Sequence, residues 1–139
     1  HYQAIISGIN NELIDYDVRG RGSNVELSPT ITIEKLTQIA NWIKSLTDDT
    51  LNKQIMLSTE VSVTNKNIQT IPTSVARELV FAGSHAVHHY AMIAQITFAQ
   101  QKSAQVTSMP ESFGLAPATA TFMRQNSKEF HEIKQTNSQ

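Results

Sequence analysis

The chain has no cysteine, and its 139 residues include only four prolines, five glycines and 6% aromatic residues. Without cysteine, disulfides and thiolate metal sites are excluded, so a transition-metal site must be built from His, Asp or Glu. No apolar run approaches the roughly 20 residues that a membrane-spanning helix needs, and no signal-peptide pattern opens the chain. These absences lead us to expect a cytoplasmic protein without a membrane partner.

The chain also lacks an excess of charge of either sign. The formal net charge is -1, so the chain has no bulk electrostatic attraction for nucleic acid, and we expect no nucleic-acid partner. Its 40% hydrophobic residues and its length fit a single domain over residues 1–139. The first residue is His1, at the start of an apolar helical stripe, and we therefore expect a domain that is incomplete at its N-terminus.

Helical periodicity is the dominant pattern in the sequence. Apolar residues recur at helical spacing in four segments, approximately 1–13, 33–47, 74–101 and 117–131. The sequence therefore predicts an all-α fold.

Two connecting segments interrupt the helices. Residues 54–71 alternate apolar and polar side chains, which predicts a short β-hairpin or an extended excursion between helices, ended by Pro72. Residues 14–30 read as a loop with charges of alternating sign. This loop is either a solvated connection held by ion pairs or a segment folded over the mouth of a pocket.

The most informative stretch is Ser84-His85-Ala86-Val87-His88-His89-Tyr90, which holds three of the five histidines. His85 and His89 are four residues apart and lie on one helical face, where two imidazoles can share a divalent metal such as Zn, Ni or Fe. His88 is rotated by about 100° from its neighbours on the helix and is expected to pack elsewhere. The alternative is an ordinary polar patch, because an i, i+4 histidine pair is only half of a metal site.

A third ligand must come from another segment. His1 is the histidine candidate, since it opens an apolar helical face, and Glu12, Asp15 and Asp17 are the carboxylate alternatives. Glu78 lies seven residues before His85, on the same face, and could orient a ligand. Its plainer interpretation is an ion pair with Arg77 or Arg124.

Three sequence blocks suggest a family. The stretches ARELVF at 76–81, SHAVHHYAMI at 84–93 and FGLAPAT at 113–119 resemble a bacterial branch of the DinB/YfiT-like superfamily. The opening HYQAI and the stretch DYDVRGRG at 15–22 are similar to the same branch.

The resemblance implies a four-helix bundle that holds a metal with three histidines. His85 and His89 match the pair on the third helix of the family, and His1 matches the ligand on the second helix. The family often carries a further histidine upstream, so the third ligand could also precede His1. The family's first helix has no counterpart before His1, and the apolar stripes that it would cover lead us to expect a homodimer.

Two classes of function follow from these expectations. The first is a metal-dependent hydrolase or thiol transferase that acts on a small-molecule substrate at an open coordination position beside the pair. The second is a non-catalytic helical bundle that serves in stress response or as a dimeric interaction protein. A metal-free, ligand-binding bundle whose histidines form hydrogen bonds is a third possibility.

Overall fold

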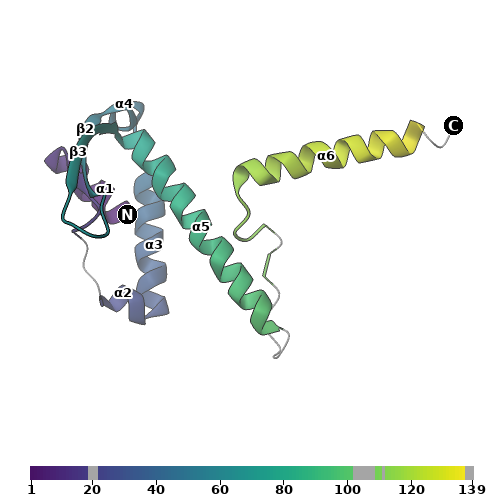
Figure 1. The fold of residues 1–139 in the computed structure, drawn as a ribbon, viewed down its shortest axis with the longest axis horizontal. Helices are drawn as coiled ribbons and strands as arrows, with labels where there is room; N and C mark the ends of the chain where they lie inside the picture. The colour runs from purple at the N-terminus through teal and green to yellow at the C-terminus, as the bar shows by residue number, and fades with distance from the viewer. Residues whose placement is uncertain (19–21, 102–108, 111, 137–139) are drawn as a thin grey trace. The chain divides into compact units, whose positions relative to one another are not determined.

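A computed structural model describes residues 1–18, 22–101, 109–110 and 112–136, with the backbone alone for residue 101 and residues 127–136. The chain divides into two compact units, His1–Ala82 (unit 1) and Gly83–Gln139 (unit 2). Each unit is described separately, and Figure 1 gives the element labels.

Unit 1 combines helices with a small sheet. The helices are α1 (Tyr2–Asn11), α2 (Asn24–Leu27), α3 (Pro29–Lys44), α4 (Asp48–Asn52) and the first turns of α5 (Val75–Gln101). The strands are β1 (Leu13–Asp15), β2 (Gln54–Glu60) and β3 (Ile68–Ser74), in the order β1-β2-β3.

The three-stranded sheet makes the prediction of an all-α four-helix bundle wrong. The predicted hairpin is confirmed as the antiparallel pair β2 and β3, but β1 extends it by pairing parallel to β2, with Ile14 opposite Leu57. Residues 13–15 had been assigned to a helix end and a loop. Pro72 also differs from expectation, because it lies within β3, opposite Met56. An edge strand tolerates proline, since the missing N–H leaves no hydrogen bond to an inner neighbour unmade.

The connection between α1 and β1 is tight for local reasons. Glu12 ends the helix in the left-handed conformation, with φ of 56°, and the Lys53 ammonium donates to the Ile9 carbonyl over 2.9 Å. Gly8 permits the close approach, because a Cβ there would lie 2.5 Å from Ile14 Cγ1. A helix and the strand that follows it can therefore fold back on one another within a few residues.

Helix α3 begins four residues earlier than its apolar period predicts. The Ser28 hydroxyl accepts a hydrogen bond from the Ile31 N–H, and Pro29 occupies the first helical turn, as is typical of helix starts. Thr32 donates its hydroxyl to the Val25 carbonyl, which ties α2 to α3.

The core of unit 1 lies where α1, the sheet and the start of α5 meet. Its buried hydrophobic residues are Ile5, Ile14, Ile55, Leu57, Val75 and Ala82. Trp42 is partly buried against this cluster. The buried positions of β2 alternate at Ile55 and Leu57, which explains why the strand was visible in the sequence.

Unit 2 contains the rest of α5 and helix α6 (Pro117–Thr136), both close to their predicted ranges. Several apolar side chains that were expected to face a core are exposed on α5, including Ile93 and Phe98 with exposed fractions of 45% and 72%. In the described part of the chain, no helix is both long enough and apolar enough to cross a membrane.

Candidate functional site

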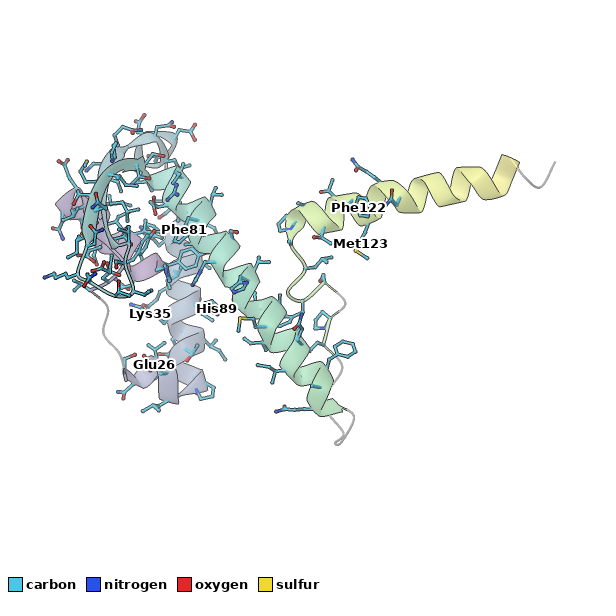
Figure 2. The ribbon with its side chains drawn as sticks, viewed as in Figure 1. Glu26, Lys35, Phe81, His89, Phe122 and Met123 are labelled. Atoms are coloured by element: carbon cyan, nitrogen blue, oxygen red, sulfur yellow. The ribbon has the colours of Figure 1, made fainter. Side chains whose placement is uncertain are left out.

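The histidine pair converges as its spacing predicts. His85 Nε2 and His89 Nε2 lie 2.9 Å apart, and the two rings meet at 84°. His85 is half-buried, whereas His89 is exposed; Figure 2 labels His89 on α5. The two nitrogens are therefore close enough to share a hydrogen bond or a metal ion, at a position beside an exposed ring.

His88 does not share this point. Its ring centroid lies 6.5 Å from that of His85 and 5.7 Å from that of His89, whereas the centroids of the converging pair are 4.5 Å apart. The difference follows from the rotation of about 100° per residue on a helix. His88 is therefore a natural control for the pair.

Phe113 and Gly114, which precede α6, pack against α5 immediately after His89. The Phe113 ring packs on the Tyr90 ring with centroids 5.3 Å apart. Gly114, with φ of 74°, runs against Ala91 so closely that a Cβ would lie 2.7 Å from the Ala91 backbone. Two of the sequence blocks that carry the family resemblance, HHYA and FGLA, therefore contact one another.

The spacing of the pair fits a shared metal ion. An ion at the usual distance of about 2.0–2.1 Å from two imidazole nitrogens that are 2.9 Å apart holds them at an angle of about 90°. That angle suits octahedral or square-planar coordination, while tetrahedral zinc needs the pair to open to about 3.3 Å. Without an ion, one ring can donate an Nε2–H to the other, so the distance agrees with either state.

The third ligand stays a prediction. Among the residues that the structure describes, no three side chains of His, Cys, Asp or Glu form a group that could hold a metal ion. His1 belongs to unit 1, and His85 and His89 belong to unit 2. Within unit 1, the His1 ring packs against Tyr16, with centroids 4.9 Å apart, and against Phe81, at 5.9 Å.

The carboxylate alternatives are engaged in local structure. Glu12 Oε1 lies 3.3 Å from the Lys53 ammonium. Asp15 Oδ1 accepts backbone hydrogen bonds from the turn that follows it, including the Asp17 N–H at 2.9 Å. Asp17 Oδ2 accepts the Glu60 N–H at 2.6 Å. Each carboxylate therefore has a structural role that accounts for its position.

Glu78 is at the centre of a closed polar network. Its side chain has no exposed surface, and its carboxylate accepts hydrogen bonds of 2.6 Å from Tyr16 Oη, Thr73 Oγ1 and Arg77. Arg77 also lies over the Phe81 ring, 5.6 Å from the centroid. The plainer interpretation of Glu78 as an ion-pair partner of Arg77 is confirmed.

The network changes the acidity of two groups. Burial alone would raise the pKa of the Glu78 carboxyl, but hydrogen bonds from Thr73, Tyr16 and Arg77, together with the Arg77 charge, hold that pKa below its ordinary value. Burial, the hydrogen bond to Glu78 and the Glu78 charge raise the pKa of Tyr16 well above its ordinary value, against a small opposing effect of Arg77. The favoured state is an ionised carboxylate with a neutral phenol donating to it.

Unit 1 also contains a pocket of about 800 Å³. One face of α1, β1 with the residues that follow it, the start of α2 and one side of α3 form its walls. Tyr16 and Val18 lie within the 14–30 segment and line the pocket, as the pocket-mouth interpretation of that segment expects.

Some of these residues were not found from the sequence. Tyr16 and Glu78 are separated by 62 positions, and no periodicity links them. Lys35, which lines the pocket from α3, is an ordinary polar-face lysine in the sequence pattern. The buried position of Glu78 among apolar residues of a helix was the one available signal.

Comparison with known proteins gives limited information. No protein-family model matches the chain, and no solved structure matches it. The chain is 29% identical over 107 residues to "FK506-binding protein 5" from Rhizopus delemar, which covers 77% of the chain and 26% of that protein. The chain therefore spans about a quarter of the length of the relative that it matches, and this similarity does not assign it to a family.

Proposed function

We propose that the chain binds one divalent metal ion through His85 and His89, with His1 as the third ligand. The observation that supports the proposal is the distance of 2.9 Å between the two Nε2 atoms, which is short enough for both to bind one ion. The resemblance to DinB-like proteins agrees with this assignment. Zn, Ni and Fe all accept imidazole ligands, and an angle of about 90° favours an ion of octahedral or square-planar preference.

The chemistry would be that of a metal-dependent hydrolase or thiol transferase. A bound divalent ion with an open position supplies a Lewis acid that lowers the pKa of water to about 7 or binds a thiol. His85 and His89 hold such an ion as neutral imidazoles, and the exposure of His89 leaves a path for a small-molecule substrate. Phe113 packs against Tyr90, the residue that follows His89 on α5. A cytoplasmic location belongs to the same proposal and rests on the cysteine-free sequence.

A second candidate function is a non-catalytic, dimeric interaction protein of the kind that serves in stress response. The exposed apolar side chains of α5 favour it, since Ile93, Ile96 and Phe98 have exposed fractions of 45%, 57% and 72%. Side chains of this size are commonly covered by a partner. A homodimer is compatible with both candidates.

Metal analysis separates the candidates. The protein is purified without a polyhistidine tag, and its content of Zn, Ni and Fe is measured before and after incubation with each ion. The metal proposal expects about one ion per chain in the wild type and a loss of most of it in the double variant His85→Ala/His89→Ala.

His88→Ala is the matched control, because it removes a neighbouring histidine whose ring does not converge on the pair. It should keep its metal. A wild type that takes up no metal, or a double variant that binds as much as the wild type, contradicts the proposal and leaves the interaction protein as the better candidate. His1→Ala then tests the third ligand separately, with an expected loss of affinity of about 10-fold or more.

A further inference from the structure

The pocket of unit 1 has the size and lining of a small-molecule site. Its volume of about 800 Å³ falls within the approximate range of 300–1,000 Å³ that is common for ligand pockets. All of its lining residues belong to unit 1, whereas the histidine pair belongs to unit 2. The inference that follows does not depend on the proposed metal.

The walls are built from rigid elements and not from one flexible loop. The α1 residues Ala4, Ser7, Gly8 and Asn11 follow one helical face, at spacings of three and four. Gly8 fixes this face against β1, and the hydrogen bond from Thr32 to Val25 holds the wall made by α2 against α3. The two sides of the pocket, α1 with β1 and α2 with α3, are therefore each held together by contacts within unit 1.

The lining contains both apolar and polar side chains, and its acidic and basic side chains besides His1 are Asp15 and Lys35. Tyr16 contributes its ring, but its hydroxyl is committed to Glu78 at 2.6 Å. The Asp15 carboxylate is neutralised in part by backbone N–H groups of the next turn. These two polar groups are therefore satisfied by the protein itself.

Lys35 is different. It lines the pocket, it is half-buried, and within the described ranges its ammonium has no hydrogen-bond or ion-pair partner. Figure 2 shows it on α3. An ammonium at a pocket, without a counter-charge among the described residues, can pair with an anionic group of a ligand.

We propose that this pocket binds a small organic carboxylate, with its apolar body along α1 and β1 and its carboxylate on Lys35. The aromatic side chains at the rim, His1 and Tyr16, with ring centroids 4.9 Å apart, favour a flat apolar body. The Asp15 carboxylate, which also lines the pocket, disfavours a ligand with a second negative charge.

The test uses a matched pair of probes, 2-naphthoate and its neutral amide, titrated into the metal-free full chain by calorimetry. The naphthoate should bind about 10-fold more tightly than the amide, because a charge-assisted hydrogen bond is stronger than a neutral one. Lys35→Met keeps the aliphatic stem and removes the charge, so it should weaken naphthoate binding by about 10-fold and leave amide binding unchanged.

Two further variants locate the site. Lys44→Met removes another lysine of α3 that does not line the pocket and should change neither affinity. Ser7→Phe fills the pocket from the exposed side of α1 and should weaken both probes. No detectable naphthoate binding, equal binding of acid and amide to the wild type, or an equal loss of both probes in Lys35→Met overturns the proposal. Binding that persists in His85→Ala/His89→Ala shows that it is independent of the metal site.

Discussion

The Glu78 carboxylate and the imidazoles of His85 and His89 belong to the same helix, α5, but differ in how far they are shielded from solvent. Glu78 is fully buried and accepts three hydrogen bonds from three other side chains. The two histidine nitrogens face one another over 2.9 Å, and one of the rings is exposed. The network of Tyr16, Thr73 and Arg77 around the buried Glu78 carboxylate is called the closed cluster. The pair of His85 and His89 is accessible to solvent and is called the open cluster.

This contrast separates a structural role from a ligand-binding role. A buried carboxylate with a full set of donors has no capacity left for a substrate, and its value lies in joining β1, β3 and α5. Two imidazole nitrogens 2.9 Å apart beside an exposed ring can exchange their mutual hydrogen bond for a shared external cation. A helical i, i+7 relationship between Glu78 and His85 is therefore not evidence that they act together.

The largest expected effect is on the closed cluster. Glu78→Ala removes the acceptor of the Tyr16 and Thr73 hydroxyls, and each lost hydrogen bond to a charged group costs about 1.5–3 kcal/mol. The free energy of unfolding, measured by urea denaturation, should fall by about 3–5 kcal/mol. Arg77 adds little, because its side chain is 57% exposed and regains water.

Glu34→Ala is the control for this substitution, since Glu34 is an exposed residue of α3. It should alter the free energy of unfolding by less than about 0.5 kcal/mol. If Glu78→Ala is no more destabilising than Glu34→Ala, the network does not hold unit 1 together, and the contrast between the clusters fails.

The loop that braces the open cluster should give the next largest effect. Gly114→Ala combines a positive φ with a Cβ placed 2.7 Å from the Ala91 backbone, and it should destabilise by about 2–4 kcal/mol in thermal or urea unfolding. Gly22→Ala is matched in backbone conformation, with φ of 69°, but its Cβ would meet nothing within 4 Å. It should cost only about 1–2 kcal/mol, and equal effects of the two would contradict the close approach to α5.

A smaller effect is expected from pH. The folded-state pKa of Glu78 lies below its ordinary value of 4.5, so its stabilising contribution is complete above pH 4.5 and is lost as the pH falls toward the folded-state pKa. The difference in unfolding free energy between wild type and Glu78→Gln should therefore shrink below pH 4.5. A difference that grows on acidification would mean that burial, not hydrogen bonding, controls this carboxyl.

The sequence predicts the elements better than their assembly. The regular apolar spacing on α5 correctly predicts a helix from about residue 74, and the alternation around Ile55 and Leu57 predicts the hairpin. Ile14 was missed as a strand residue, because a three-residue strand has no detectable period and pairs with a partner about 40 positions away. A single parallel contact of this kind changed the fold class.

The candidate site shows the same limit. The convergence of His85 and His89 is a property of one helix, and four-residue spacing is enough to predict it. The Tyr16–Glu78 hydrogen bond and the pocket around Lys35 depend on tertiary packing between distant segments. No local pattern in the sequence contains that information.

The central claim is that the open cluster binds a metal ion, and nuclear magnetic resonance of the histidine side-chain nitrogens tests it most directly. The metal-free protein is titrated with Zn²⁺. We expect the Nε2 resonances of His85 and His89 to shift together, and these shifts to be complete at one equivalent of Zn²⁺. The resonances of His88 should stay in place. Unchanged resonances of the pair, or equal shifts of His88, would contradict the claim.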